Sequence, residues 1–344
     1  MVDMGTHLLL RPRPGSVFTI KGAALAGVTR GRIDRHPEVR APIPGVRIRV
    51  RPIPEDEPVW ETRRRTVLQL AQAYRMVMPP HVFFSHTTAV EIYGAGLPAP
   101  LSARKFDLAR PGTSMSGLIE ASAFAPRRSP RAAVVVAHQV SAGTCSVIEH
   151  GGFRVSDPAS TWAMLADRLT VEELVVLGDS LVRRKRVGGT PLELAPPALT
   201  TVDDLAVAVY AGRRRGAAKL RQALPLVRQG ASSDLETLQR LAMRADGLPE
   251  PELDFDVFTE SGMFLGCSEF AFPRHKVAME CEGDQHRTDR AQWNRDIRKY
   301  QAYMEAGWLV VRATGPEIRY GRAEPVRRVR AALIQRGWRP GDPA

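Results

Sequence analysis

Residues 252–287 have the sequence ELDFDVFTESGMFLGCSEFAFPRHKVAMECEGDQHR, whose pattern predicts a three-stranded β-meander. Apolar residues alternate with aspartates over residues 253–257, which is the period of a strand with one buried face. Gly262 and Pro273 mark the two turns. The strands are expected at residues 253–257, 264–272 and 277–282. We expect this meander to form the centre of a C-terminal domain.

The register of the second turn decides where the carboxylates of the meander lie. If Arg274 and His275 form a two-residue hairpin loop, Glu269 lies opposite Glu280, with Cβ atoms roughly 5 Å apart. Glu282 follows Glu280 by two residues and points to the same face. Carboxylates in one patch raise one another's pKa values, and a hard divalent cation such as Mg²⁺ holds such a group together. The alternative is a sheet whose solvent-facing side simply carries Glu280 and Glu282.

A helix is expected just before the meander, within the stretch SSDLETLQRLAMRADGLPEP at residues 232–251. Ser233 and Glu236 have the spacing of a capping box, and Gly247 ends the helix. The residues expected on its buried side are Leu238, Leu241, Ala242 and Ala245.

Further features follow the third strand. Gly283 ends it, and His286 comes soon after, where it can approach the same edge of the sheet. A helix is expected over residues 291–307, and a short buried strand, WLVVRAT, begins at Trp308. The large residues at helical spacing are Trp293, Ile297, Tyr300 and Met304.

The stretch from Glu236 to Trp338 resembles the PD-(D/E)xK nucleases, in particular the very-short-patch-repair-like branch often labelled domain of unknown function 559. The resemblance is carried by ETLQRL, LGCSEFAFP, VAMECEGDQH and WNRDIRKYQAYMEAGWLVVR, and it covers about a third of the chain. It implies a restriction-endonuclease-like α/β fold in the order helix, three-stranded meander, helix, strand. It also implies phosphodiester hydrolysis with Mg²⁺, or with Mn²⁺ in its place.

The same resemblance assigns roles to five residues. Glu269 stands where the family usually has Asp, and Glu280 stands at the main strand glutamate. Glu282 takes the place of the family's lysine, which this branch commonly replaces with an acid, and His286 matches a histidine that the branch carries after its glycine. Glu236 matches a helix glutamate that reaches the metal, although capping explains it equally well. The implied metal ligands are thus Glu269, Glu280 and Glu236, and the implied catalytic residues are Glu269, Glu280, Glu282 and His286.

Two departures from the family pattern affect the chemistry. Glu269 is one methylene longer than Asp, and a shift of that size in a ligand matters to catalysis. Because no lysine follows at the strand end, the charge of the transition state must be met by the metal, His286 or an arginine such as Arg287 or Arg312.

The N-terminal part has a basic helical pattern. The stretch FTIKGAALAGVTRGRIDR and the later PGVRIRV predict a helix, a turn, a basic helix and a basic strand, the order of a winged helix-turn-helix. The nucleic-acid contacts expected there are Arg30, Arg32, Arg35, Arg47 and Arg49. Together with FFSHTTAVEIYGAGLP, these stretches resemble the winged-helix region of abortive-infection-type antitoxins, which implies DNA binding and regulation. The alternative is a small helical cap with solvated arginines.

Composition favours a polyanionic partner. The 344 residues carry 49 Lys and Arg against 37 Asp and Glu, a formal charge of +12. The alternative is an arginine-rich surface from a high-GC genome. Three cysteines without metal-ligand spacing, no signal-peptide pattern and no run of about 18 apolar residues predict a cytoplasmic chain without a membrane span. No organic cofactor is indicated, and the oligomeric state is left open.

The expected class is α+β, with a winged-helix-like N-terminal region, a mixed middle scaffold and a restriction-endonuclease-like C-terminal domain. His86, beside Ser85, is interpreted as a capping or packing residue. The expected function is a metal-dependent DNA endonuclease with an accessory DNA-binding region, and the alternative is a non-catalytic DNA-binding regulator. The expected segments are a leader at 1–16, the winged-helix-like and helical region at 17–98, the scaffold at 99–187, a linker and helix at 188–231, and the nuclease domain at 232–344.

Overall fold

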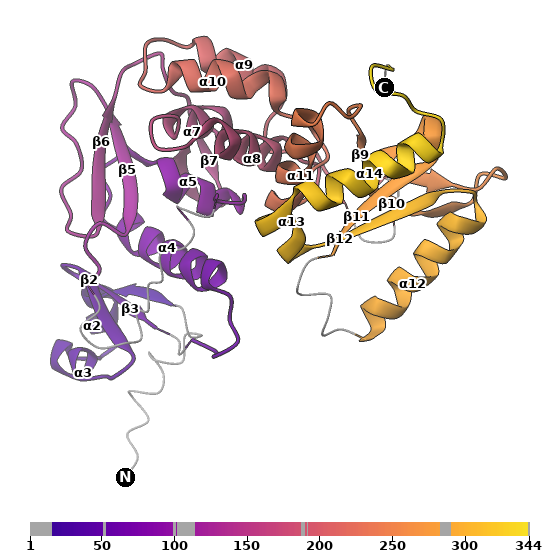
Figure 1. The fold of residues 1–344 in the computed structure, drawn as a ribbon. Coiled ribbons are helices and arrows are strands. Elements are labelled where there is room, and N and C mark those ends of the chain that lie inside the picture. The colour runs from indigo at the N-terminus through magenta and orange to yellow at the C-terminus, as the bar shows by residue number, and fades with distance from the viewer. Residues whose placement is uncertain are drawn as a thin grey trace. The chain divides into compact units, whose positions relative to one another are not determined.

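The chain has a mixed α+β architecture in two compact units, as seen in a computed structural model (Figure 1). The first unit comprises Met1–Arg168 and Val207–Ala217, and the second comprises Leu169–Ala206 and Ala218–Ala344. The second unit therefore begins well before residue 232, because α8 (Val171–Val182) packs against α11 (Asp234–Ala245). The residues that the structure describes are 16–50, 53–98, 101, 114–186, 190, 192–282 and 290–342.

The first unit begins with a small body of helices on a three-stranded sheet. Its elements are β1 (Val17–Thr19), α2 (Ile20–Leu25), α3 (Arg30–Asp34), β2 (Val39–Ile43) and β3 (Val46–Arg49). β3 lies between β1 and β2 and pairs antiparallel with both. Thr19 caps α2, since its hydroxyl accepts a hydrogen bond from the Gly22 amide at 2.9 Å. The two helices lie where the sequence predicts them, and a hairpin follows instead of a single strand.

The rest of the first unit is built on a five-stranded sheet in the order β6-β5-β4-β8-β7. Its strands are β4 (Val82–Phe84), β5 (Ile119–Phe124), β6 (Val135–Val140), β7 (Val147–His150) and β8 (Phe153–Ser156). Its helices are α4 (Val59–Arg75), α5 (His86–Tyr93) and α7 (Pro158–Met164). β5 runs antiparallel to β4 and parallel to β6. Gly94 ends α5 in the left-handed conformation that glycine adopts without a steric penalty.

The second unit surrounds a four-stranded sheet in the order β12-β11-β10-β9. The strands are β9 (Glu252–Phe258), β10 (Phe264–Phe272), β11 (Val277–Glu282) and β12 (Leu309–Thr314). The helices beyond α8 and α11 are α12 (Arg290–Glu305), α13 (Gly315–Gly321) and α14 (Ala323–Gln335). α9 (Val202–Tyr210) and α10 (Ala217–Ala223) cross the boundary between the two units.

The predicted register of the central hairpin is confirmed, although the loop is longer than the two residues from which the register was argued. β10 pairs antiparallel with β11, with Phe270 opposite Met279 and Phe272 opposite Val277. A one-turn 3₁₀ segment, Pro273–His275, closes the hairpin, and Lys276 completes it in the left-handed region at a φ of 46°. β12 then adds parallel to β11, so that Arg312 lies beside Glu280.

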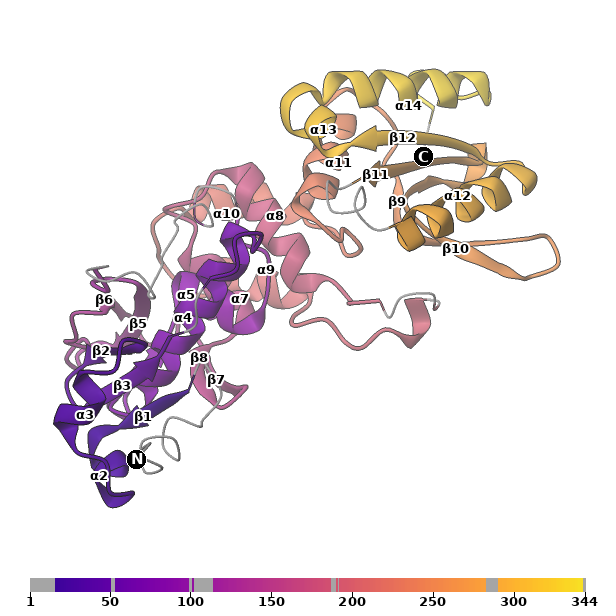
Figure 2. The ribbon, with the colours of Figure 1, turned by 90° about the horizontal axis from the view of Figure 1, so that it is seen from below.

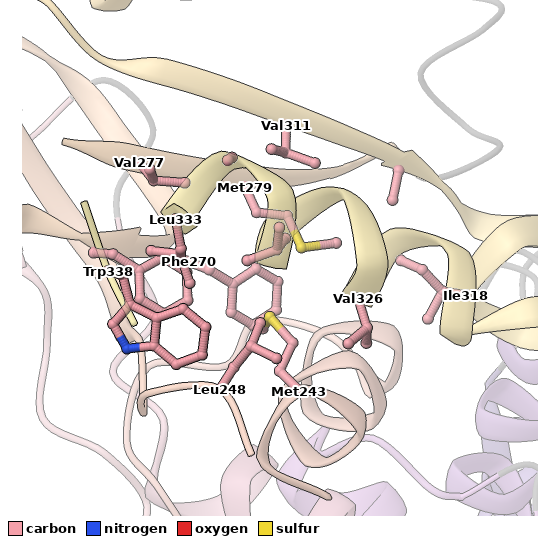
Figure 3. Packing of buried hydrophobic residues seen from close by; sticks show 14 residues of the cluster. Met243, Leu248, Phe270, Val277, Met279, Val311, Ile318, Val326, Leu333 and Trp338 are labelled. Atoms are coloured by element: carbon pink, nitrogen blue, oxygen red, sulfur yellow. The ribbon is translucent and has the colours of Figure 1, made fainter. Parts of the chain in front are cut away.

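The two faces of this sheet are covered by different helices (Figure 2). One face packs on α11, α13 and α14 through a large apolar cluster that includes Phe270, Met279 and Trp338 (Figure 3). The other face packs on α12 through a smaller cluster around Ala278 and Tyr303. Burial of the larger cluster supplies the main hydrophobic stabilisation, at about 25 cal/mol per Å² of apolar surface. On the side of the smaller cluster, Lys299 of α12 and Glu280 of β11 also form an ion pair.

Three helical expectations need correction. On α11, three of the predicted four, Leu238, Leu241 and Ala242, are half-buried and Ala245 is exposed. The fully buried residues of this helix are Glu236, Thr237, Gln239, Arg240 and Met243. The reason is that α11 packs against α8, where buried Asp179 accepts hydrogen bonds from Arg240 and Thr237 at 2.9 and 2.8 Å. On α12, Ile297 and Met304 are exposed, whereas Tyr303 is buried. α13 and α14 were not predicted at all.

Within the described part of the chain, no helix is both long and apolar enough to cross a membrane.

Candidate functional site

The hairpin of β10 and β11 brings together the two glutamates on which the sequence argument depends. Glu280 is buried, at 3% exposure, and Glu269 is partly exposed. Glu269 accepts a hydrogen bond from the Cys281 amide across the two strands. The Oε1 atom of Glu280 is buried and has no hydrogen-bond partner among the described residues. A buried carboxylate oxygen without a partner is costly, so this atom marks a place where a ligand would be stabilised.

Glu236 approaches the same hairpin from the start of α11. It is 3% exposed, and its carboxylate accepts hydrogen bonds from the Ser232 amide at 2.6 Å and the Ser233 hydroxyl at 2.9 Å. Ser233 in turn accepts from the Glu236 amide. The helix start is thus capped as predicted, except that Glu236 reaches back to Ser232. Burial raises the pKa of Glu236 to about 7, which the two serine hydrogen bonds only partly oppose.

These carboxylates destabilise one another's charged forms. Burial raises the pKa of Glu269 well above its usual range, and the negative charges of Glu236 and Glu280 raise it further. Burial also raises the pKa of Glu280, against the opposing charge of Lys299. Carboxylate oxygens are the ligands that a hard divalent cation prefers. Among the described residues, however, these three glutamates do not form a group whose ligand atoms all lie within 4.8 Å of one another.

Lys299 on α12 is the site residue that the sequence interpretation missed. Its Nζ lies 2.7 Å from Oε2 of Glu280, and its side chain is 23% exposed. Burial would lower the pKa of Lys299, but the Glu280 carboxylate outweighs burial and the pKa is raised. The ammonium group therefore stays charged at neutral pH beside the candidate metal ligands.

A signal for Lys299 was present in the sequence. The side of α12 that packs toward the sheet carries Asp296, Lys299, Tyr300 and Tyr303, at a spacing of three, four and seven residues. Lys299 lies 5.5 Å from the ring centres of Tyr300 and Tyr303. A polar stripe at helical spacing, directly after a strand with glutamates, indicates a helix that covers a site and not an apolar core.

Glu282 is placed differently from the other glutamates. It forms an ion pair with Arg312 on the adjacent strand β12, and its side chain is 26% exposed. Arg312 also lies 4.9 Å from the ring centre of Tyr300. Glu282 and Arg312 thus form a charged pair at the solvent side of the carboxylate group. His286 and Arg287 lie outside the described residues.

The arginines expected to contact nucleic acid fall into two groups. Arg47 is buried, and its guanidinium binds Asp34 at 2.7 Å, while Arg49 binds Glu38 at 2.7 Å. Arg30 is exposed and pairs with Asp34 at 3.3 Å. Arg32 is half-buried and Arg35 is exposed. Arg47 therefore contributes to the fold of the small body. The exposed arginines of this region are Arg30 on α3 and Arg35 at the end of that helix.

Comparisons with known proteins give few functional leads. No protein-family model matches the chain, and no solved structure matches it. Two proteins of Mycobacterium tuberculosis, from strains CDC 1551 / Oshkosh and ATCC 25618 / H37Rv, are each 28% identical over 193 residues, which is 56% of this chain. Both are described as uncharacterized, and the matched region spans 65% of their length.

Proposed function

We propose that the second unit is a metal-dependent nuclease that hydrolyses phosphodiester bonds in DNA. The observation that carries the proposal is the meeting of Glu269, Glu280 and Lys299, with one buried carboxylate oxygen of Glu280 left without a partner. The sheet order β12-β11-β10-β9 with helices on both faces supports a restriction-endonuclease-like fold for this unit. The order helix, meander, helix, strand supports it as well.

The residues would divide the work as follows. Glu269 and Glu280, together with Glu236 from the start of α11, would hold Mg²⁺ or Mn²⁺ through carboxylate oxygens. When bound, the cation polarises the scissile phosphate and lowers the pKa of a water molecule. Lys299 remains cationic, so it cannot act as the base and instead stabilises the negative charge that develops on the phosphate. In the nuclease family that the sequence resembles, a lysine at the position of Glu282 would have this role.

The N-terminal body supplies the affinity for DNA in this proposal. Two short helices, α2 and α3, followed by the β2–β3 hairpin support a winged helix-turn-helix. Arg30, Arg32 and Arg35 lie on α3 or at its end, where they would contact phosphates. The formal charge of +12 supports a polyanionic partner.

Cleavage of supercoiled and linear DNA tests the nuclease proposal. The full chain is assayed with Mg²⁺, with Mn²⁺ and with EDTA, beside Glu280→Ala and the matched control Glu260→Ala, whose carboxylate is exposed in a turn. We expect metal-dependent nicking by the wild type and the control, and only the EDTA background from Glu280→Ala. Full activity of Glu280→Ala would remove Glu280 from the site.

The alternative function, a DNA-binding regulator of the antitoxin type without catalysis, is favoured by one observation. Glu269 already accepts a hydrogen bond from the Cys281 amide, which occupies a lone pair that a metal ligand would use. Salt-sensitive DNA binding with no cleavage under any metal would favour this function.

A further inference from the structure

A second group of polar residues lies in the first unit, whereas the carboxylates discussed above belong to the second unit. His86 is the first residue of α5, Glu120 lies on β5 and His138 lies on the neighbouring strand β6 (Figure 1). One potential ligand atom from each of the three lies within 4.8 Å of the others. Glu120 and His86 are buried, at 5% and 9% exposure, and His138 is half-buried. Glu120 and His138 are neighbours because β5 and β6 are adjacent parallel strands, and the Thr87 amide at the start of α5 binds the Glu120 carboxylate beside His86.

Glu120 is held as a fixed, ionised carboxylate. Arg168 binds both of its oxygens, at 2.8 and 3.0 Å, and the Thr87 amide donates to Oε2 at 2.9 Å. Nε2 of His138 lies 3.0 Å from Oε1. Burial alone would raise the pKa of Glu120, but the hydrogen bonds from His138 and Arg168 and the charge of Arg168 bring it well below its usual range. The group is therefore a carboxylate at every physiological pH.

His86 is held in place at a conformational cost. Its φ is 51°, in the left-handed region that a non-glycine residue occupies only when the surroundings enforce it. Nδ1 of its ring lies 2.9 Å from the Ser85 hydroxyl, which lies 2.7 Å from the Ser122 hydroxyl. When Nδ1 donates to Ser85, Nε2 carries a free lone pair, as a metal-ligating histidine requires.

Ion pairing alone does not account for this arrangement. Thr87 and Arg168 bind Oε2 of Glu120, whereas Oε1 also faces Nε2 of His138, whose ring stacks on that of His86 with their centres 3.9 Å apart. Two imidazoles and one carboxylate form the ligand set of catalytic zinc sites, which keep a further position open. Imidazole nitrogen also selects Zn²⁺ and its neighbours over Mg²⁺.

We propose that His86, Glu120 and His138 form a binding site for a first-row transition-metal cation, with Zn²⁺ as the best fit. Ser85 orients His86, and Arg168 orients Glu120, as outer residues of the site. The packing role expected for His86 is thus extended to metal binding. This site takes a different class of cation from the Mg²⁺ proposed for the second unit, and it stands whether or not that unit cleaves DNA.

Zinc titration of the metal-stripped full chain tests the proposal. Calorimetry is run on the wild type, on His138→Ala, and on the matched control His81→Ala, whose ring contacts the Arg128 carbonyl outside the site. We expect one equivalent of Zn²⁺ per chain for the wild type and the control, and an affinity reduced more than about 100-fold in His138→Ala. The absorption spectrum of the Co²⁺-loaded wild type should indicate nitrogen and oxygen ligands without sulfur.

Two further variants separate the possible outcomes. Ser85→Ala should weaken Zn²⁺ binding by about 10- to 100-fold while the ligands remain. Glu280→Ala should leave Zn²⁺ binding unchanged, because its carboxylate belongs to the second unit. The proposal is overturned if the wild type binds no Zn²⁺, if His138→Ala binds it as tightly as the control does, or if the Co²⁺ spectrum indicates thiolate ligands.

Discussion

The two units bury glutamates in opposite electrostatic situations. In the first unit, Glu120 has a guanidinium on both oxygens and an imidazole on one, and its pKa is lowered. In the second, burial raises the pKa values of Glu236, Glu269 and Glu280, although Lys299 pairs with Glu280 and the charge of Arg183 acts on Glu236. Burial acts in the same direction on all four. The charges and hydrogen-bond donors around each carboxylate therefore decide whether a buried glutamate is ionised: Glu120 accepts from a guanidinium and an imidazole, whereas Glu269 lies beside two other carboxylates.

The largest effect is expected from removing the cation that pairs with Glu280. Lys299→Met should lower the DNA cleavage rate by about 10²–10³-fold, because a charge that stabilises the transition state is lost. Mg²⁺ affinity should not fall, since the carboxylates remain. Lys299→Arg should recover part of the rate. Single-turnover cleavage rates at saturating Mg²⁺ are the measurement.

The control for this change is Lys276→Met. Lys276 donates to the Ala306 carbonyl at 3.2 Å and lies in the turn between β10 and β11. Its loss should leave cleavage unchanged. Cleavage by Lys299→Met at the wild-type rate would show that the amine of Lys299 has only a structural role beside Glu280.

A smaller effect is expected from breaking the ion pair of the first unit. Arg168→Met leaves Glu120 buried without its cation, and removal of one partner of a buried pair costs about 3–5 kcal/mol. Because the Arg168 side chain is 35% exposed, solvent screening should reduce the loss to about 2 kcal/mol. Amide hydrogen exchange in β4 and β5 at neutral pH measures it, with the exposed Arg131→Met as the control.

The stability difference between wild type and Arg168→Met should depend on pH, because it requires an ionised Glu120. The folded pKa of Glu120 lies below its unfolded value, so the ion pair stabilises the fold above the unfolded pKa, at about 4.3, and this contribution is lost as the pH falls further. The difference between wild type and Arg168→Met should therefore shrink below that pH. A difference that stays constant down to pH 3 would contradict the assignment of a charged Glu120.

The sequence predicts the strands of the second unit better than its helices or its sites. β10 and β11 have the predicted bounds and register, because alternation and a short turn are local properties of the chain. The buried stripe of α11 was mispredicted because Arg240 is fully buried against Asp179, some 60 positions earlier in the sequence. A periodic pattern of apolar residues cannot reveal a helix face that is buried through an ion pair with another helix.

The two candidate sites also differ in how much of each could be predicted from local sequence. The proximity of Glu269 and Glu280 could be predicted because one hairpin carries both, whereas Lys299 reaches Glu280 from a helix that the tertiary fold places over the sheet. Glu120 and His138 lie on strands whose adjacency depends on a parallel pairing that no short motif encodes. Local sequence therefore predicts the half of a site that lies within one supersecondary unit.

The smallest effect concerns the proton on Glu236. Its folded pKa, about 7, lies above its unfolded value, so the folded state holds a proton that the unfolded state releases. Stability should therefore fall as the pH rises from about 4.3 to about 7. Glu236→Gln carries no titrating proton, and in the absence of metal it should gain about 1–2 kcal/mol relative to wild type between pH 5 and pH 8. Urea unfolding at a series of pH values measures this change.

Glu317 provides the matched control, because it lies in the same unit and its pKa is shifted in the opposite direction. It caps α13 as Glu236 caps α11, but the Thr314 amide lowers its pKa, with only a weak opposing effect of burial. Glu317→Gln should therefore lose stability relative to wild type as the pH rises through about 4.3. Saturating Mg²⁺ should abolish the gain in Glu236→Gln and leave Glu317→Gln unaffected, since only the first carboxylate faces the proposed cation. Equal pH slopes in the two variants would mean that helix capping, and not the carboxylate group around Glu269, sets the charge of Glu236.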